Sequence, residues 1–250
     1  MSVENNNINI LIVSNEKYLK YAIPLARSIS NNCTNFNIHL HLINSHSTKV
    51  DKKLLKRVRN IKIYKVFREF ASEEEEAGFC ANYRFLVMPD LLKDYSNNVI
   101  YLDADSIVRC DLSSDSDINS YLNECDVALM TSKRIPPSTI IDVSTIDFKR
   151  QKRRVAFKTG VLVISNSEKI IRFFEDVRDG ISTHGETKWY SDQLSFFDSV
   201  EKLGGELTLL QLTSSLFGLK LRQSDKIWVI KGDKYRNHQK YIDVINSLII

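Results

Sequence analysis

Two aspartates, Asp103 and Asp105, follow directly on the apolar run Val99–Leu102, and their type and spacing suit the binding of a cation. An apolar run of this kind is typical of a strand that is buried on both faces. Because side chains alternate along a strand, both carboxylates are expected to point the same way, about 7 Å apart. Such a pair can chelate one divalent cation, directly or through water, and the cation can neutralise a phosphate group of a substrate. The alternative is an ordinary acidic strand end or helix cap.

Further polar residues are candidates for contacts with the same ligand. The planar guanidinium of Arg84 suits a phosphate group or a sugar-bound carboxylate pair, and a surface salt bridge is the alternative. Asp192 and Gln193 could fix the hydroxyl groups of a sugar, unless Asp192 only caps the predicted helix that it begins. Asn15 could bind a pyrimidine edge or cap a helix, and Tyr18 could stack on a base or pack under the sheet edge.

Two other patterns have both a functional and a structural interpretation. Lys231, Gly232 and Lys234 are typical of a phosphate loop, because glycine permits close backbone approach and ammonium groups pair with phosphate oxygens. An exposed basic turn is the alternative for this loop. His39 and His41 could bind a metal, but a polar strand face explains two alternating histidines better.

The run Lys149–Arg154 holds five cations in six positions. Blocks of like charge are usually solvated, and the functional alternative is attraction to an anionic membrane surface or to an acidic glycan acceptor. The net charge of the chain is only +4, which does not by itself argue for nucleic acid as a partner. We therefore expect no nucleic-acid binding.

The elements that must position these residues alternate between strands and helices. Strands are expected at Ile8–Val13, Ile38–Asn44, Ile61–Phe67, Val99–Leu102, Asp126–Thr131, Val155–Ser165, Leu207–Leu212 and Leu219–Val229. Helices are expected at Tyr18–Ser30, Val50–Val58, Phe79–Tyr95, Asn119–Asn123, Lys169–Gly180 and Tyr190–Leu203, with an irregular excursion over Ile135–Arg154. The leading β-α-β-α-β order predicts a parallel, right-handed, doubly wound sheet, whose ligands bind outside the carboxyl ends of the strands.

Composition fits one domain over residues 1–250, with 43% hydrophobic and 26% charged residues. The four cysteines are far apart and form no CxxC pair, so they suggest neither a zinc site nor a disulfide framework. Neither an apolar signal segment nor an apolar run near 18 residues is present in the sequence. We therefore expect a cytoplasmic protein with reduced thiols.

Five segments in order resemble the GT-A fold glycosyltransferases, and most closely glycosyltransferase family 8. They are Ile10–Tyr18 with a following helix that carries Ser28, Tyr83–Phe85, Tyr101–Asp105, Phe157–Ile164 and Ser191–Gln193. The resemblance implies an α/β, Rossmann-like fold with a mostly parallel central sheet flanked by helices. It also implies an enzyme that uses Mn²⁺ or Mg²⁺ to move a sugar from a nucleotide-diphosphate donor, a UDP-sugar above all, to a hydroxyl group of a saccharide or glycolipid, with retention at the anomeric carbon.

Carried over residue by residue, the resemblance makes Asp103 and Asp105 the metal ligands and Asp192 and Gln193 the catalytic pair. It implies donor binding by Val13, Asn15, Tyr18, Arg84, Asp103, Ala104, Asp105, Lys158, Thr159, Gly160, Lys231, Gly232 and Lys234. Two positions depart from the family pattern. Val229 stands where the family has a metal-binding histidine, for which His238 is a candidate replacement, and Lys158 stands where the family usually has asparagine.

Two other functions remain open on the sequence. A nucleotidyltransferase that makes nucleotide-sugars would also use an α/β sheet and a divalent cation, but the first turn, Ser14–Tyr18, lacks the glycines of its phosphate loop. A catalytically inactive nucleotide-sugar-binding module would keep the fold, and Val229 in place of the histidine favours it.

Overall fold

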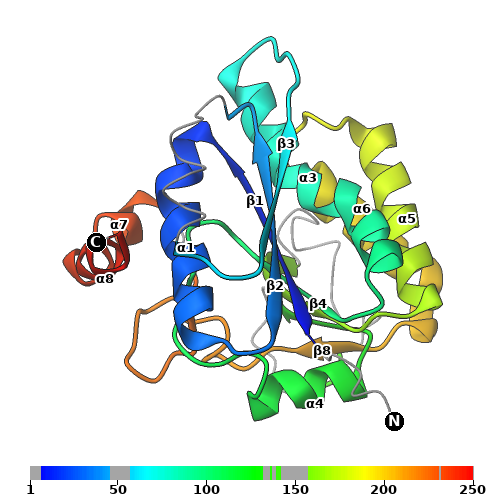
Figure 1. The fold of residues 1–250 in the computed structure, drawn as a ribbon. Coiled ribbons are helices and arrows are strands. Elements are labelled where there is room, and N and C mark those ends of the chain that lie inside the picture. Colours follow the sequence, from blue (N-terminus) through cyan, green and yellow to red (C-terminus); the bar gives the residue numbers. More distant parts are fainter. Residues whose placement is uncertain are drawn as a thin grey trace.

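The computed structural model describes residues 7–45, 57–131, 136, 139–141, 157–230 and 232–249. Its centre is a seven-stranded sheet in the order β3-β2-β1-β4-β7-β6-β8 (Figure 1). The strands are β1 (Ile8–Asn15), β2 (Phe36–Ile43), β3 (Ile61–Val66), β4 (Val99–Leu102), β6 (Val127–Thr131), β7 (Phe157–Ile164) and β8 (Leu209–Gln211). A separate two-stranded sheet pairs β5 (Ile107–Val108) with β9 (Ile227–Trp228).

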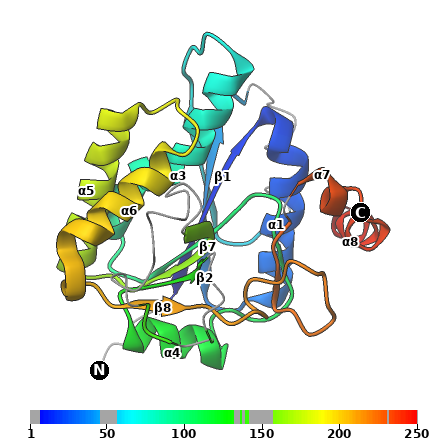
Figure 2. The ribbon, with the colours of Figure 1, turned by 180° about the vertical axis from the view of Figure 1, so that it is seen from behind.

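The helices lie on both faces of this sheet. They are α1 (Leu19–Asn32), α3 (Glu73–Asp94), α4 (Ser116–Glu124), α5 (Glu168–His184), α6 (Ser191–Leu203), α7 (Asp233–Arg236) and α8 (Gln239–Ile249), with 3₁₀ turns η1 (Glu16–Tyr18) and η4 (Gly204–Glu206). Figures 1 and 2 show α1, α7 and α8 on one side of the sheet and α3, α5 and α6 on the other. No helix within these described ranges is both long enough and apolar enough to span a membrane.

The sheet separates two hydrophobic cores because the side chains of its central strands alternate between the faces. In β1, Ile10 and Ile12 pack into the core under α1, whereas Leu11 and Val13 pack into the core under α3, α5 and α6. In β4, Ile100 belongs to the first core and Tyr101 to the second. The apolar run before Asp103 is therefore a strand buried on both faces, as the sequence predicts.

The sheet is mostly parallel, with one reversed strand. β1 pairs in parallel with β2 and β4, and β2 with β3, but β7 runs antiparallel to both β4 and β6. Because Leu102 at the end of β4 faces Val161, the residues that open β7 extend beyond the end of β4. Gly160 accepts a hydrogen bond from the amide of Asp103 at 2.9 Å. The reversal therefore places the beginning of β7 beside the carboxyl end of β4.

Several elements differ from the expected ones. The predicted strand over Leu219–Val229 is limited to β9, because Leu221 has a positive φ of 51° and Asp225 accepts the amide of Arg222 in a turn. Helix α3 begins at Glu73, where Ser72 caps an acidic first turn that suits the positive end of the helix dipole. The predicted helix Val50–Val58 falls mostly, and the basic run Lys149–Arg154 entirely, outside the described residues.

Helices α7 and α8 were not expected, and they fix the last part of the chain to α1 and to the turn after β4. Tyr241 of α8 is fully buried and donates its hydroxyl to the carbonyl oxygen of Asp105 at 2.9 Å. Arg27 of α1 donates to the carbonyl oxygen of Leu248. The apolar residues of α8 pack with Trp228 in a third, smaller core. The C-terminal helices thus form a wall beside Asp105.

Candidate active site

A cleft of about 820 Å³ lies at the carboxyl ends of β1 and β4, where an open α/β sheet binds its ligands. Its lining includes most of the site residues expected from the sequence. These are Val13, Asn15, Tyr18, Arg84, Asp103, Ala104, Asp105, Thr159, Gly160, Asp192, Gln193 and Gly232. The fold therefore gathers residues from six separate segments around one cavity.

Asp103 and Asp105 both line the cleft, but they do not continue the strand. β4 ends at Leu102, and the amide of Ser106 donates to the carbonyl oxygen of Asp103 at 2.9 Å to close a turn. The expectation that strand alternation extends to Asp105 is therefore wrong. Asp103 faces an arginine of α3, whereas Asp105 faces an arginine of α7 from the other side of the sheet.

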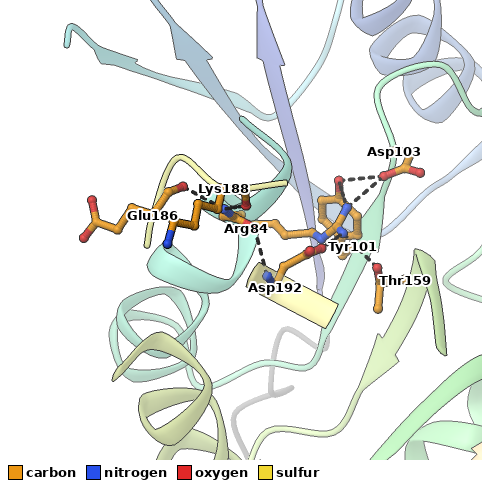
Figure 3. A network of polar contacts seen from close by, with 8 residues as sticks. Arg84, Tyr101, Asp103, Thr159, Glu186, Lys188 and Asp192 are labelled. Atoms are coloured by element: carbon orange, nitrogen blue, oxygen red, sulfur yellow. Dashed lines mark hydrogen bonds and ion pairs between the residues drawn. The ribbon is translucent and has the colours of Figure 1, made fainter. Parts of the chain in front are cut away.

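Arg84 is the centre of a buried polar network at the base of the cleft. Figure 3 shows Tyr101, Asp103, Thr159 and Asp192 around its guanidinium. Nη1 donates to the Tyr101 hydroxyl at 3.1 Å and to Asp103 Oδ1 at 3.2 Å. Nη2 donates to Thr159 Oγ1 at 2.8 Å and to Asp192 Oδ2. The surface salt bridge considered for Arg84 is excluded, because only 7% of the residue is exposed.

The charges of this network keep Arg84 ionised. Burial by itself lowers the pKa of the guanidinium, but Tyr101, Asp192 and Asp103 together raise that pKa above its ordinary value. Burial and the charge of Asp103 raise the pKa of the Tyr101 phenol, so Tyr101 is neutral and donates to Asp103 Oδ1 at 2.8 Å. One arginine therefore joins the aspartate after β4 to the aspartate at the start of α6.

Asn82 of α3 positions the start of α6. Its side-chain oxygen accepts the amide of Asp192 at 2.9 Å, and its nitrogen donates to the carbonyl oxygens of Glu186 and Lys188 at 2.7 and 3.0 Å. The cap residue of α6 is Tyr190, with φ 72° and no side-chain capping bond, so the capping interpretation of Asp192 is wrong. The carboxylate of Asp192 instead forms an ion pair with Arg84.

Gln193, the neighbour of Asp192, lines the cleft with a side-chain oxygen that can accept a hydrogen bond. Its Oε1 atom is buried and makes no hydrogen bond within the described part of the chain. A buried carbonyl oxygen without a partner is costly, so such an atom in a cleft is suited to a ligand donor. A sugar hydroxyl group is a donor of the required kind.

Arg236 of α7 was missed by the sequence analysis. Its Nε and Nη2 atoms donate to Asp105 Oδ2 at 2.9 and 2.8 Å, and its guanidinium lies 5.0 Å from the centroid of the Tyr18 ring. Burial by itself lowers the pKa of Arg236, but the hydrogen bonds and charge of Asp105 raise it above its ordinary value. The available signal was the helical spacing of Tyr241 and Val244 downstream, which places a packed helix directly after this arginine.

The late loop supplies fewer site residues than expected. Val229 is fully buried in the core under α1, and Gly232 lines the cleft with φ 77°, which glycine adopts without strain. Lys234 is exposed and outside the cleft lining, and Lys231 lies outside the described residues. The side chain of His238 is exposed, and Arg236 rather than this histidine contacts Asp105.

In the first turn, Asn15 has the structural role that was considered for it. Its Oδ1 accepts the amide of Tyr18 at 3.1 Å and caps η1, while its Nδ2 donates to Glu76 of α3 at 3.1 Å. Tyr18 is half-buried, and both residues also line the cleft. Lys158 of β7 does not line it, because only its neighbours Thr159 and Gly160 reach the cavity.

His39 and His41 form a polar aromatic cluster within the sheet rather than a metal site. His39 contacts the Tyr64 hydroxyl and Asn9 Oδ1, both at 3.2 Å, and the ring of His41 stacks on Tyr64 at 4.4 Å. Burial lowers the pKa of each imidazole to about 4, with a further contribution from Lys62 for His39 and from His39 for His41. The interpretation as a strand face is therefore preferred to metal binding.

The acidic residues of the cleft suit a cation that is shared with a ligand. No group of three His, Cys, Asp or Glu side chains within the described ranges is arranged to hold a metal ion by itself. Mg²⁺, however, is commonly held by one or two carboxylates together with substrate phosphates and water, and Mn²⁺ favours the same oxygen ligands. Asp103 and Asp105 are a donor set of this kind.

Comparison with known proteins agrees with this arrangement. The family model for glycosyl transferase family 8 matches residues 9–176. The galactosyltransferase LgtC, solved with donor and acceptor sugar analogs, is similar with a TM-score of 0.61 and 17% identity over 96% of this chain and 95% of that chain. No curated protein sequence matched.

Two further solved structures share the fold. The bifunctional glycosyltransferase WbbM has a TM-score of 0.62 and 15% identity over 100% of this chain and 50% of that chain. GlyE of Streptococcus pneumoniae has a TM-score of 0.57 and 14% identity over 98% of this chain and 62% of that chain. These similarities establish the GT-A fold, and because the family model spans more than half of the sequence, the chain belongs to glycosyl transferase family 8 and is a glycosyltransferase.

Proposed function

We propose that this glycosyltransferase takes a sugar from a UDP-sugar and transfers it to a hydroxyl group of a saccharide or glycolipid acceptor. The observation that carries the proposal is the single cleft that joins an aromatic first turn, the two aspartates after β4 and the Asp192–Gln193 pair. The order of these groups matches the order of a base, a diphosphate and a sugar. The related LgtC structure was solved with donor and acceptor sugar analogs, which supports a sugar donor and a sugar acceptor for this chain.

In this proposal the first turn binds the nucleoside and the aspartate turn holds the diphosphate. Tyr18 lines the cleft and would stack on the base, and Asn15 caps η1, the turn that carries Tyr18. Family 8 enzymes of this fold generally depend on a divalent metal, and Asp103 and Asp105 would hold Mn²⁺ or Mg²⁺ here. When bound, such an ion acts as a Lewis acid that neutralises charge on the departing diphosphate.

Asp192 and Gln193 are assigned to the sugar. The carboxylate of Asp192, held in place by the always-charged Arg84, stabilises positive charge that develops at the anomeric carbon. The Oε1 atom of Gln193 accepts a hydrogen bond from a sugar hydroxyl group. Since the leaving phosphate can take the acceptor proton on the same face of the sugar, no further carboxylate base is required, and we infer retention of configuration.

A donor screen tests this function. Purified protein is incubated with UDP-sugars and Mn²⁺, and released UDP is measured with and without an acceptor. Asp103→Ala and Asp105→Ala are expected to abolish release while the proteins stay folded, and the anomeric proton coupling of the product is expected to show retention. Full activity in excess EDTA would contradict the metal assignment, and a β-linked product from an α-linked donor would contradict retention.

The nucleotide-sugar-binding module remains the second candidate, because Val229 is buried in the core instead of facing the cleft and Asp105 is paired with Arg236. The same screen separates the two functions. An enzyme releases UDP from its donor, at least slowly to water, whereas a binding module binds the donor and leaves it intact.

A further inference from the structure

The pairing of Asp105 with Arg236 has a consequence for cation binding. Two guanidinium nitrogens of Arg236 donate to one carboxylate oxygen of Asp105. The side chain of Arg236 is 19% exposed and that of Asp105 is 8% exposed. A buried carboxylate that is already neutralised in this way attracts a free cation weakly, because the cation must first replace the guanidinium. In the donor-free protein, Asp105, one of the two proposed metal ligands, is therefore already paired with Arg236.

The two arginines of the cleft differ in how firmly they are held. Arg84 is buried at the base of the cleft and bonded to four side chains that come from three other elements and the turn after β4. Arg236 instead lies in the cleft wall, with its guanidinium 5.0 and 5.9 Å from the rings of Tyr18 and Tyr21. A guanidinium beside aromatic rings can exchange one anion for another at small cost, since its contact with the rings does not depend on the anion that it pairs with.

Arg236 is one of several residues that attach the C-terminal helices. The hydroxyl of Tyr241 already bonds the carbonyl oxygen of Asp105, and α8 already packs on α1 through Arg27 and a small apolar core. The contact between Arg236 and Asp105 therefore adds charge neutralisation to an anchor that exists without it. A planar guanidinium matches a phosphate group in geometry as well as it matches a carboxylate.

We propose that Arg236 is an exchangeable counter-ion: it neutralises Asp105 in the donor-free enzyme and passes to the donor diphosphate when the cation takes Asp105. The proposal rests on the proposed use of a nucleotide-diphosphate donor. It makes Arg236 a donor-binding residue and couples the two ligands, so that Mn²⁺ and UDP each bind weakly alone and strongly together. Such coupling keeps a divalent cation from occupying the cleft without a donor.

The experiment measures binding and not turnover. Free Mn²⁺ is followed by its electron paramagnetic resonance signal in titrations of the protein, and UDP binding is followed by calorimetry with and without Mn²⁺. Arg236→Ala is expected to bind Mn²⁺ alone about fivefold or more tighter than the native protein, because Asp105 loses its counter-ion. The same variant is expected to bind UDP in the presence of Mn²⁺ about fivefold or more weaker, because the diphosphate loses a cation.

A matched control removes another arginine from an ion pair with an aspartate. Arg178 of α5 pairs with Asp90 at 3.1 Å on the far side of the sheet, and Arg178→Ala is expected to change neither affinity. Arg236→Lys keeps the positive charge but lacks the planar guanidinium with its paired N–H donors. Its affinities for Mn²⁺ and for UDP are expected to lie between those of the native protein and of Arg236→Ala. Thermal unfolding of each variant reports whether it is folded. If Arg236→Ala is not folded, the titrations of Arg236→Lys test the proposal.

The outcomes separate this inference from the proposed function. Opposite changes in the two affinities support the exchange. A fall in both affinities, or no change in either, overturns it and leaves Arg236 a structural residue. If the native protein does not bind UDP with Mn²⁺ at all, the proposed donor is wrong, whereas UDP binding that is insensitive to Arg236 rejects the exchange alone.

Discussion

In the proposed reaction the chemistry depends most directly on Asp192, whose carboxylate is both buried and paired with Arg84. Asp192→Asn keeps the shape of the side chain and removes its charge. We expect turnover to fall about 10²-fold or more, the scale of losing one preorganised charge-stabilising group, with a much smaller change in donor KM. Steady-state kinetics over donor concentration would check this.

The control for this variant is Asp198→Asn on the same helix, where the side chain is 43% exposed and contacts His184. It is expected to leave turnover unchanged. Both Asp192→Asn and Asp192→Ala break a buried ion pair, a change that costs about 3–5 kcal/mol of stability, and Asp192→Ala is less informative because it also removes the oxygen that accepts from Arg84. Thermal unfolding curves separate the two causes, and a rise in donor KM with unchanged turnover in Asp192→Asn would contradict the catalytic role.

At the residue level, the sequence identified many of the side chains that meet in the cleft but not how they pair. Asp103, Asp105, Arg84 and Asp192 lie in short motifs that can be recognised one by one. Their partners depend on which helix approaches which side of β4, and this is decided by tertiary packing. Arg236 could not be paired with Asp105 before α7 and α8 were known to return to the end of β4.

At the level of elements, Gly78 lets α3 approach the segment that leads into α6. A Cβ atom at this position would lie 1.9 Å from the carbonyl oxygen of Thr187 and 2.7 Å from its carbonyl carbon. Gly78→Ala should therefore lower both the unfolding midpoint and turnover, although alanine is a better helix former than glycine by about 1 kcal/mol. A lower midpoint would show that the steric clash of the Cβ atom outweighs the higher helix propensity of alanine, and a higher midpoint would show the reverse.

Gly205→Ala is the matched control, because a Cβ atom there meets nothing within 4 Å. Its unfolding midpoint and turnover should stay close to those of the native protein. If Gly78→Ala instead raised the midpoint, the close packing of α3 on the segment before α6 would be disproved, and with it the reason for the placement of Asp192.

The elements themselves were predictable where their pattern is strong. Buried apolar runs predicted β1, β2 and β4, and helical spacing predicted α1, α5 and α6 to within a few residues. The direction of β7 was not predictable, because a strand that is buried on both faces has the same apolar pattern whether it runs parallel or antiparallel to its neighbours. The segment 219–226 has only two apolar residues, Leu219 and Leu221, and a turn with a left-handed residue stands there in place of the predicted strand.

At the level of the whole molecule, the buried histidines of β2 make stability depend on pH. Burial lowers the pKa of His39 and His41 to about 4, whereas an unfolded histidine titrates near 6.5. Between these values the unfolded chain binds more protons, so the free energy of unfolding falls as the pH falls. The slope reaches about 1.4 kcal/mol per pH unit for each histidine, and the effect vanishes above about pH 6.5.

His41→Phe tests this dependence, because a phenyl ring can keep the stacking on Tyr64 and cannot take up a proton. The slope of unfolding free energy between pH 4.5 and 6.5, measured with urea, is expected to fall to about half. His238→Gln changes an exposed histidine and should leave the slope as it is. An unaltered slope in His41→Phe would show that other groups cause the dependence.

The turn after β4 receives its last partners from the end of the described chain, since the Tyr241 hydroxyl and the Arg236 guanidinium both bond to Asp105. A ribosome delivers those residues after the strands and helices that form the sheet, and folding during synthesis begins with the N-terminal part. The sheet can therefore assemble before its binding cleft has a second wall. A growing polypeptide therefore carries Asp103 and Asp105 before the cleft beside them is closed, and that wall of the cleft is complete only when α7 and α8 have docked.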